Sequence, residues 1–296
     1  MFKGTDIINF FEVFATDLDC LEYLSNEKWS EEYQCVKCKH RGWCKTSKPF
    51  VRKCNKCKHK ESATAGTLFH KVKFSLKKAF YITFMMSSSK KSCSSEEFAR
   101  KLSLPKSTCW LFQHKVRQAM KSSEKYPIKT KAVVDEFNWG GKEEGKKGRS
   151  KGKKKEVVMA IEYNGFGILR CYCQVIKKAG TKELRPFIET HIDKNTEIKT
   201  DKWRGYTPLK KEFPKLIQIK SDHGKNFPLI HRQIMMFKAW LRGIHHHCKH
   251  LQNYLDEFCY RFNRLRHLDT IFNNLIVRMV KANPVPLKKL KIQWGN

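Results

Sequence analysis

Four cysteines in two regularly spaced pairs constrain this chain more than any other feature of its sequence. Cys35 and Cys38 form the first pair, Cys54 and Cys57 form the second, and fifteen residues separate the two pairs. This C-x2-C-x15-C-x2-C spacing is typical of a zinc ribbon, in which each pair lies on a tight turn and the four thiolates surround one ion. We therefore expect a structural Zn2+ site with these four cysteines as its ligands.

Other cysteines and one histidine offer alternatives to this assignment. His40 and Cys44 lie between the two pairs and are alternative zinc ligands. Cys171 and Cys173 are two residues apart on an expected strand, so they face the same side of it. A buried cysteine usually behaves as a small apolar side chain, so core packing is favoured there over a second metal site.

The charge of the chain indicates what it binds. The 296 residues include 61 Lys and Arg against 28 Asp and Glu, a formal net charge of +33. Such an excess favours polyanionic partners and does not specify a fold. The apolar fraction of 40% is sufficient for a packed core. The sequence contains no apolar run long enough for a transmembrane helix, and residues 1–14 lack the pattern of a secretory signal.

Residues 71–124 are expected to be helical, and two of these helices have the spacing of a helix-turn-helix. Ser94 and Glu97 form a capping-box pattern at the start of one helix, which ends at Leu102 before Pro105. A second helix follows after a short turn. This arrangement in a basic segment favours a DNA-binding helix-turn-helix, although an ordinary helical hairpin has the same pattern. The residues of this segment that we expect to contact DNA are Lys106, Gln113, Lys115 and Arg117.

A lysine-rich segment of low complexity follows. Lys142 to Lys155 contains eight basic residues and three glycines. We expect a flexible arm that binds phosphates without reading sequence, the alternative being a merely solvated loop. The arm residues expected to contact DNA are Lys146, Lys147 and Lys153.

The remaining residues predict a mixed sheet. The expected elements are strands at 132–137, 157–163 and 167–176, a helix at 181–191, strands at 197–201 and 216–220, and helices from about 229 onward. The two strands after the arm are joined by Asn164-Gly165, a hairpin signal. This β-β-β-α-β-α-β-α order gives a mixed sheet flanked by helices and matches an RNase H-like fold. The fold class is therefore α/β (α+β): a zinc ribbon, a helix-turn-helix and an RNase H-like domain.

Two acidic residues gain a role from that order. Asp135 lies on the first strand of the expected sheet and Asp201 ends the fourth. These strands are neighbours in an RNase H-like sheet, so the two carboxylates meet. Paired carboxylates bind Mg2+ or Mn2+, which prefer oxygen ligands and support phosphoryl transfer.

Nearly all of the sequence between residues 18 and 285 resembles transposases of the ISXO-like insertion-sequence group, which are related to the eukaryotic Merlin elements. The segments that carry the resemblance are Cys35–Cys57, Ser62–His70, Asp135-Glu136 with Gly140-Gly141, Thr200–Tyr206, Lys238–Gly243, Lys249–Phe258 and Arg261–Arg264. The resemblance implies a DDE-type nuclease and strand transferase with a structural zinc and a catalytic Mg2+ or Mn2+. Asp135 and Asp201 match the first two catalytic acids of the family.

The third catalytic position departs from the family pattern. The family has Glu or Asn about 35 residues after the second acid, and Met236 occupies that place here. A thioether is a poor ligand for a hard cation, so the resemblance implies impaired chemistry. The alternative is that a nearby group serves instead. The candidates are Asp222, His231 and Gln233.

Two basic and two aromatic side chains near these positions are further candidates for DNA contact. Lys238 and Arg242 are expected to hold a phosphate near the acids. Trp203 and Trp240 suit stacking on a base and core packing equally well.

Two further features are interpreted as structural. Glu257 precedes Arg261 by four residues, and we expect a helical ion pair between them. Consecutive histidines at 245–247, with His250, cannot all face one ion from a helix. DNA contact or packing is therefore favoured there over zinc.

These observations divide the chain into residues 1–70, with a helical lead and the ribbon, 71–124, with the helix-turn-helix, and 125–296, with the RNase H-like domain. The predicted function is a transposase that binds terminal inverted repeats and target DNA and cuts and joins strands. The alternative is a catalytically inactive, transposase-derived DNA-binding protein or regulator. We expect a cytoplasmic, nucleoid-associated bacterial protein that forms a homo-oligomer on DNA and does not use a membrane.

Overall fold

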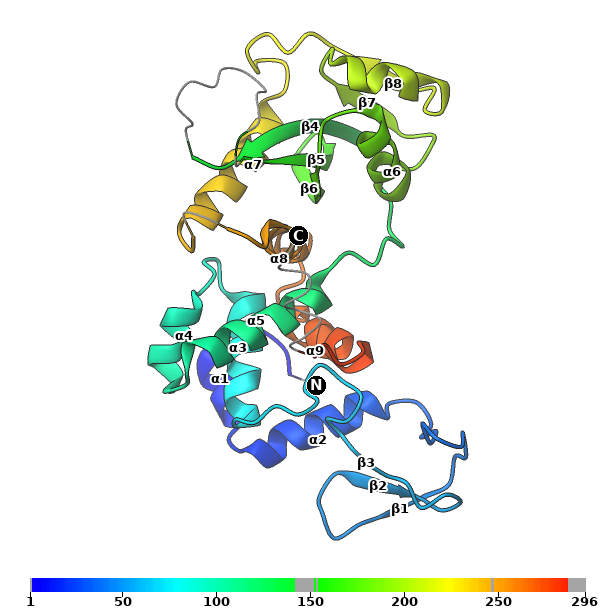
Figure 1. The fold of residues 1–296 in the computed structure, drawn as a ribbon, viewed down its shortest axis with the longest axis vertical. Helices are drawn as coiled ribbons and strands as arrows, with labels where there is room; N and C mark the ends of the chain where they lie inside the picture. Colours follow the sequence, from blue (N-terminus) through cyan, green and yellow to red (C-terminus); the bar gives the residue numbers. More distant parts are fainter. Residues whose placement is uncertain (1, 142–151, 153, 246–247, 287–296) are drawn as a thin grey trace. The chain divides into compact units, whose positions relative to one another are not determined.

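The computed structural model describes residues 2–141, 152, 154–245 and 248–286, and Figure 1 traces their path. They fall into two units. The first is built from residues up to Met120 together with residues from Arg264 onward, and the second from Lys121–Asn263. Among the described helices, none combines the length and the apolar character that crossing a bilayer requires.

Helices make up most of the first unit. They are α1 (Ile7–Val13), α2 (Asp17–Lys28), α3 (Leu76–Ser88), α4 (Ser95–Leu102), α5 (Lys106–Met120) and α9 (Ile271–Lys281). A full capping box starts α2: the Asp19 amide donates to Thr16 Oγ1 at 3.3 Å, and the Thr16 amide donates to Asp19 Oδ2 at 2.6 Å. This reciprocal pair satisfies two backbone donors at the helix start. The helical lead expected before the ribbon is therefore two capped helices.

Phenylalanine rings form the core of the helical unit. Phe10 of α1 stacks on Phe84 of α3, with ring centroids 4.5 Å apart. Phe272 of α9 lies 5.7 Å from Phe10 and 6.0 Å from Phe84. Because aromatic pairs add to the free energy of burial, this cluster holds α9 among the N-terminal helices. Residues 271–281, grouped with the sheet in the sequence analysis, thus pack with α2, α3 and α5.

Helices α4 and α5 form the expected helix–turn–helix pair. Ser94 Oγ accepts from the Glu97 amide at 3.1 Å, which confirms Ser94 as the cap of α4. The helix ends at Ser103 in the left-handed conformation, and Pro105 prevents its continuation. The predicted start and end of α4 are correct.

The ribbon is a three-stranded antiparallel sheet packed on the end of α2. Its strands are β1 (Trp43–Lys45), β2 (Val51–Cys54) and β3 (Lys60–Ser62), in the order β1-β2-β3. The Arg52 guanidinium lies between the rings of Trp29 and Trp43, 4.3 Å and 3.9 Å from their centroids. Lys28 of α2 pairs with buried Glu61 at 2.7 Å. The ribbon is therefore fixed to the helical unit through one face of its sheet.

The second unit is a five-stranded mixed sheet with the order β6-β5-β4-β7-β8. The elements are β4 (Lys131–Trp139), β5 (Lys155–Asn164), β6 (Gly167–Ile176), α6 (Thr181–His191), β7 (Glu197–Thr200), the 3-10 helix η1 (Arg204–Lys211), β8 (Leu216–Gln218), α7 (Pro228–Arg242) and α8 (Leu251–Phe262). Strand β7 is parallel to both of its neighbours, β4 and β8, and the other pairs are antiparallel. The predicted mixed sheet with an RNase H-like strand order is confirmed.

Each face of this sheet packs on its own set of helices, and side-chain alternation assigns the residues of β4 between them. Val133 and Phe137 pack with α7 and α8 on one face, whereas Ala132 and Val134 pack with α6 and η1 on the other. Since strand side chains alternate, Asp135 faces α7 and Glu136 faces η1. The hydrogen bond from Tyr206 Oη of η1 to Glu136 Oε2, at 2.7 Å, agrees with this assignment.

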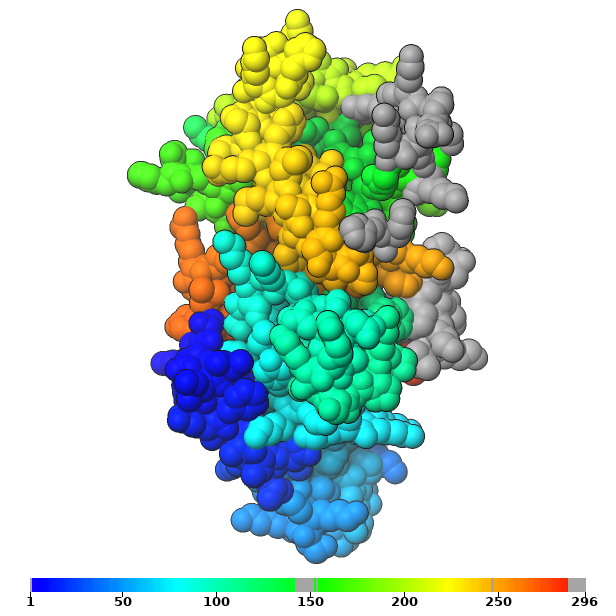
Figure 2. Space-filling model, turned by 90° about the vertical axis from the view of Figure 1, so that its left-hand side faces the viewer, coloured from blue at the N-terminus to red at the C-terminus, as the bar shows by residue number. Residues whose placement is uncertain are grey.

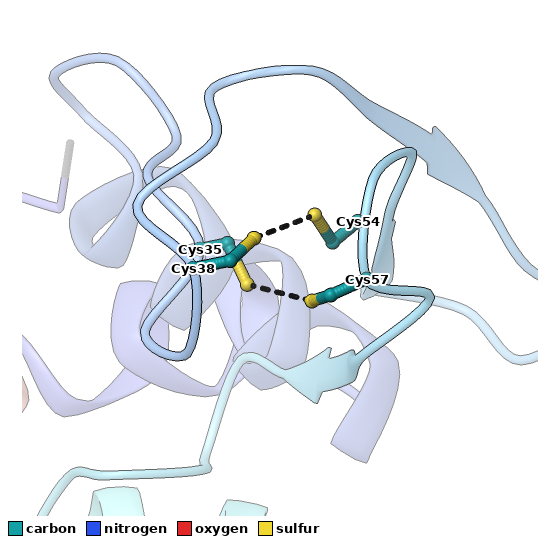
Figure 3. A group of neighbouring side chains, drawn as sticks. All are labelled: Cys35, Cys38, Cys54 and Cys57. Carbon is teal, nitrogen blue, oxygen red and sulfur yellow. Dashed lines mark hydrogen bonds between the residues drawn. The ribbon is translucent and has the colours of Figure 1, made fainter.

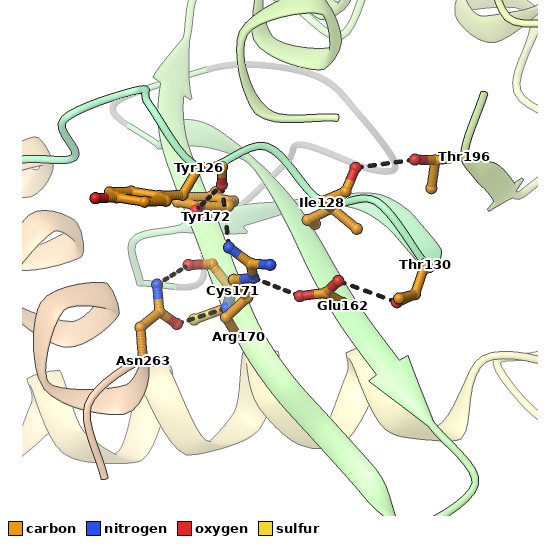
Figure 4. A network of polar contacts seen from close by, with 9 residues as sticks. All are labelled: Tyr126, Ile128, Thr130, Glu162, Arg170, Cys171, Tyr172, Thr196 and Asn263. Carbon is orange, nitrogen blue, oxygen red and sulfur yellow. Dashed lines mark hydrogen bonds and ion pairs between the residues drawn. The ribbon is translucent and has the colours of Figure 1, made fainter. Parts of the chain in front are cut away.

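A polar network holds the segment that enters β4, as Figure 4 shows. Arg170 pairs with Glu162 and also donates to the Tyr126 carbonyl at 3.2 Å. Thr196 Oγ1 donates to the Ile128 carbonyl at 2.9 Å. These bonds join the segment just before β4 to β6 and to the loop before β7. They therefore fix the start of β4 relative to β7.

Candidate functional site

The structure brings the four predicted zinc ligands into one cluster, shown in Figure 3. All four sulfur atoms lie within 4.8 Å of one another. Cys35 Sγ is 3.5 Å from Cys57 Sγ, and Cys38 Sγ is 3.6 Å from Cys54 Sγ. With Zn–S bonds of about 2.3 Å, neighbouring sulfurs of a tetrahedral site lie about 3.8 Å apart. The cluster therefore fits a four-thiolate Zn2+ site.

The two halves of this cluster repeat the same turn. The Cys35 amide donates to the His40 carbonyl and the Cys54 amide to the His59 carbonyl, both at 2.9 Å. Lys39 and Lys58, which directly follow the second cysteine of each pair, adopt φ angles of 61° and 60°. Identical turns present both thiolates of each pair to one point, and the repeat Cys-x-Lys-Cys-Lys-His accounts for it.

The remaining candidates for zinc are outside this cluster. Cys44 is exposed on β1, level with Lys53 of β2. The imidazole of His40 lies against Gly42, where any Cβ would come within 2.7 Å of its Nε2. The closely spaced group of ligand atoms around the two turns consists of the four cysteines and includes neither His40 nor Cys44. The backbone amide of Cys38, which bonds the Cys35 thiolate, lowers the pKa of Cys35 to about 6.

Asp135 is the central side chain of the acidic site. It lies on β4, and its carboxylate is 18% exposed. Its Oδ1 accepts from the Glu136 amide at 2.8 Å, and its Oδ2 lies 3.1 Å from His231 Nε2. Burial raises the pKa of Asp135 and the nearby charge of Asp201 raises it further, against the Glu136 amide and His231, which lower it. A cation at this position would offset both effects.

Asp201 follows β7 and faces the same side of the sheet. The parallel register pairs Val133 with Lys199, so two more residues along each strand place Asp201 beside Asp135. Neighbouring strands lie about 4.8 Å apart, which leaves two adjacent carboxylates space to share a metal ion. The Asp201 Oδ1 atom accepts from the Trp203 amide at 2.9 Å, which orients the carboxylate. The structure thus brings the two predicted acids together on one face of the sheet.

His231 of α7 completes this group, with help from a glycine. Gly224 has a φ of +90°, and a Cβ built on it would lie 2.5 Å from His231 Cε1. Only a glycine therefore lets the loop before α7 run this close to the imidazole. Gly224 was not among the residues predicted from the sequence, unlike His231. The sequence signal for this glycine is the Asp222-His223-Gly224 turn just before the proline that begins α7.

The position of Met236 on α7 separates it from the acids. Each residue turns a helix by about 100°, so Met236 is about 140° from His231 around the axis, whereas Met235 is about 40° from it. Met236 is 47% exposed and Met235 is 59% exposed. Lys238, seven residues after His231, lies on the histidine's side with its ammonium 5.2 Å from the Phe137 ring. Of the two methionines, Met235 is the one beside His231 and Lys238.

The other substitutes for the third acid point elsewhere. Asp222 is exposed in the loop before α7. Gln233 is fully buried and donates to Cys171 Sγ at 3.6 Å. Cys171 itself lies 3.8 Å from Cys259 Sγ in the core, which agrees with a packing role.

The residues expected to contact DNA fall into four groups. Lys106 is exposed and pairs with Glu96 at 2.6 Å, and Arg242 is exposed at the end of α7. Lys115 is half-buried, and burial lowers its pKa. Gln113 and Arg117 are each only 1% exposed, because they lie on the face of α5 that packs inward. Their burial argues against DNA contact by these two side chains. Lys146, Lys147 and Lys153 lie outside the described residues.

The remaining side chains act in the core. Trp203 Nε1 donates to the Ala179 carbonyl at 2.6 Å, and Trp240 packs 5.7 Å from the Phe258 ring. The expected Glu257–Arg261 ion pair is present at 3.6 Å. His245 Nε2 lies 2.6 Å from the Tyr254 hydroxyl, whereas residues 246–247 lie outside the described chain.

Comparison with known proteins agrees with this geometry. Residues 129–263, which include Asp135, Asp201 and the whole five-stranded sheet, match the family described as ISXO2-like transposase domain. A search of curated proteins gave no significant match. The matched segment coincides with the sheet unit and contains both acids and His231. Residues 129–263 of this chain form an ISXO2-like transposase domain of the DDE type.

Proposed function

We propose that this chain is a DNA transposase that binds terminal inverted repeats and catalyses metal-dependent strand cleavage and transfer. The observation that supports it most is the pairing of Asp135 and Asp201 on one face of the sheet inside a transposase domain. The charge of +33 suits a chain that holds terminal and target DNA together.

Asp135, Asp201 and His231 are the residues that would hold the divalent ion. Two carboxylates and an imidazole are an acceptable donor set for Mn2+ and a less favourable one for Mg2+, because imidazole is the softer ligand. When bound, the ion activates the attacking oxygen and stabilises the leaving oxygen of phosphoryl transfer. His231 thereby replaces the carboxylate or amide that the family resemblance places near Met236.

The chain's own groups orient the reacting parts. The Glu136 amide and the Trp203 amide hold the two carboxylates through the bonds described above. Lys238 is half-buried beside Phe137, and burial together with the charge of Arg242 lowers its pKa. A partly desolvated ammonium is a strong partner for a phosphate oxygen, so Lys238 and Arg242 position the scissile phosphate.

DNA binding is assigned to the exposed basic residues. Lys106, Lys115 and Arg242 are at least partly accessible, and the ribbon and the segment from Lys142 to Lys155 supply further lysines. Each neutralised phosphate adds about one unit to the salt dependence of binding, so affinity should fall steeply as salt rises.

The test combines metal binding with cleavage. Manganese binding is measured by electron paramagnetic resonance on native protein and on Asp135→Asn, Asp201→Asn and His231→Ala, and cleavage is measured on DNA carrying the element's terminal repeats. We expect each substitution to weaken Mn2+ binding and to reduce cleavage by about 10²- to 10³-fold, the range for loss of one charge-stabilising group.

The second candidate is an inactive DNA-binding protein, favoured by the absence of a carboxylate at Met235 and Met236. Tight, salt-sensitive binding to terminal repeats, with neither Mn2+ binding nor cleavage by the native chain, would establish this second function and exclude the first.

A further inference from the structure

The N-terminal helices present an unusual number of apolar side chains to solvent. Thirteen large apolar residues are exposed in the described part of the chain, and five of them lie within residues 7–18. They are Ile7, Ile8, Phe11, Val13 and Leu18, with exposed fractions from 42% to 68%. We name these five residues the N-terminal apolar patch. In Figure 2 the dark blue segment that carries them stands on the surface of the molecule.

The patch belongs to well-anchored helices. Phe10 of α1 and Phe14, which follows the helix, are at most 1% exposed and pack in the phenylalanine core. Around the helix axis they lie between Val13 and Ile7. Asp17 at the start of α2 accepts from Ser75 Oγ at 2.6 Å and from the Lys77 amide at 2.8 Å. Ile7, Phe11 and Ile8 lie within about 100° of one another around α1 and form an exposed apolar stripe, whereas Val13 lies on the other flank of the buried rings. An exposed apolar stripe of this kind marks an interaction site.

The N-terminal segment that carries the patch has the opposite charge to the rest of the chain, although Lys77 of α3 lies against the patch, with its ammonium 5.5 Å from the Phe11 ring. Residues 2–33 hold eight acidic side chains and two lysines, whereas the other residues hold 20 acidic and 59 basic side chains. Six of the eight are exposed, Glu12 and Glu22 among them. An acidic surface repels DNA phosphates and attracts a basic protein surface. The N-terminal helices are thus the part of this chain least suited to lie on DNA.

A second apolar segment belongs to the same unit. The Gly4 amide donates to the Asp269 carbonyl at 2.9 Å, which joins the N-terminal segment to the turn before α9. Leu265 and Leu268 in this turn are 54% and 38% exposed. They are further exposed apolar side chains of the same unit, outside α1.

We propose that the N-terminal apolar patch and its acidic surround are a docking surface for a second copy of this chain. The charge complementarity favours that occupant, because the rest of the same chain is strongly basic. A head-to-tail contact, in which the acidic helices of one copy meet a basic surface of the next, follows from this difference. The apolar side chains supply the buried centre of the contact and the carboxylates its rim.

The inference is independent of strand cleavage, and the proposed function gives it a purpose. A protein that joins two terminal repeats must hold two DNA ends in one assembly. Helices that avoid DNA and bind another copy would link the two copies without competing for phosphates.

The experiment measures self-association of the full chain without DNA, by sedimentation velocity over a range of protein concentrations. The test variant is Ile8→Asp with Leu18→Asp, which replaces the two most exposed members of the patch. We expect the dissociation constant of the dimer to rise at least about tenfold, as for loss of a central apolar contact. The matched control is Phe166→Asp, because Phe166 is 98% exposed at the β5–β6 turn of the sheet unit. It should leave the constant unchanged.

A second variant tests the proposal even if the first variant does not fold. Glu12→Lys with Glu22→Lys keeps the apolar patch and reverses its surround, so dimerisation should weaken at low salt and recover at high salt. A native protein that stays monomeric at every concentration would overturn the proposal. So would a dimer that neither variant weakens, which would place the contact elsewhere. Cleavage activity is not measured in this experiment, so failure of the proposed function would leave its outcome unaffected.

Discussion

The chain contains two candidate metal sites that are built in opposite ways. In the ribbon, four identical ligands come from two copies of one turn, and every ligand lies within 23 residues of the others in sequence. In the sheet unit, Asp135, Asp201 and His231 come from two strands and a helix that span almost a hundred residues. The first site is closed, and all four of its ligand atoms are sulfur. The second site is partly open and combines carboxylate oxygens with an imidazole nitrogen.

The difference teaches which sites can be found from sequence alone. A short turn fixes its own geometry, so the spacing of cysteines determines where their sulfur atoms lie. The acids meet only because β4 and β7 are adjacent and parallel, which depends on the whole sheet. The third position depends in addition on the rotation of α7, where an error of one residue moves a side chain by about 100°.

The largest expected effect tests the closed site. We expect Cys54→Ser to remove the bound zinc and unfold the ribbon, because a structural zinc contributes about 10 to 16 kcal/mol of apparent binding free energy in small zinc domains. Zinc content per chain and the absorption of a cobalt-substituted sample measure the change. Cys44→Ser is the matched control, since Cys44 is exposed on β1 and outside the cluster. Retention of one zinc per chain by Cys54→Ser would contradict the four-cysteine assignment.

The second effect tests how acid acts on the sheet unit. His191 stacks on Tyr172, with centroids 4.5 Å apart, and burial lowers its pKa from 6.5 to about 4. Below pH 6.5, His191 therefore binds a proton in the unfolded chain but stays neutral in the folded chain until the pH approaches 4. Stability is fully present above pH 6.5 and is lost as the pH falls toward 4, by at most about 3 kcal/mol.

Chemical denaturation of native protein and His191→Phe between pH 4 and pH 7 measures this loss. The variant should lose the corresponding part of the pH dependence, whereas His267→Phe, at an exposed histidine, should retain it. Equal slopes for native protein and His191→Phe would show that another group titrates.

Most of the architecture was predictable because its signals are local. The strand at 167–176 and the helix at 181–191 have the predicted bounds. The strand order of the sheet agrees with the order expected from the succession of strands and helices along the chain. A hairpin signal at Asn164-Gly165, strand alternation and helix caps each act over a few residues. The pairing of Asp135 with Asp201 followed once the order of strands was known.

The remaining features depended on packing that no short pattern encodes. Gln113 and Arg117 have the chemistry of a DNA contact, yet α5 turns them inward, with Gln113 Nε2 donating to the Cys93 carbonyl at 2.8 Å. In a helix that has basic and apolar side chains on every side, the sequence does not show which side faces solvent. The return of α9 to the N-terminal helices likewise rests on Phe272 and on rings 188 or more residues away.

The third effect sharpens the comparison at the loop that supports His231. We expect Gly224→Ala to weaken Mn2+ binding about tenfold, the lower range for loss of a group that orients a metal ligand. The added Cβ would overlap the imidazole, and the φ of +90° would be strained. Electron paramagnetic resonance measures the affinity. Gly165→Ala, where an added Cβ meets nothing within 4 Å, is the control. An unchanged affinity in Gly224→Ala would remove His231 from the ligand set.

The smallest effect separates the two methionines of α7. The family resemblance places the third catalytic group at Met236, whereas the rotation of the helix places Met235 between His231 and Lys238. We expect Met236→Asn to change Mn2+ affinity and end cleavage less than about twofold, because a side chain on the far side of α7 meets neither acid. Met235→Asn, on the same side as His231, is the matched comparison and should strengthen Mn2+ binding. Suppose that Met236→Asn raised both Mn2+ affinity and cleavage and that Met235→Asn raised neither. The third catalytic position would then be predicted correctly by its spacing from Asp201 in the sequence and not by the rotation of α7. The open site would in that case be as predictable from sequence as the zinc site.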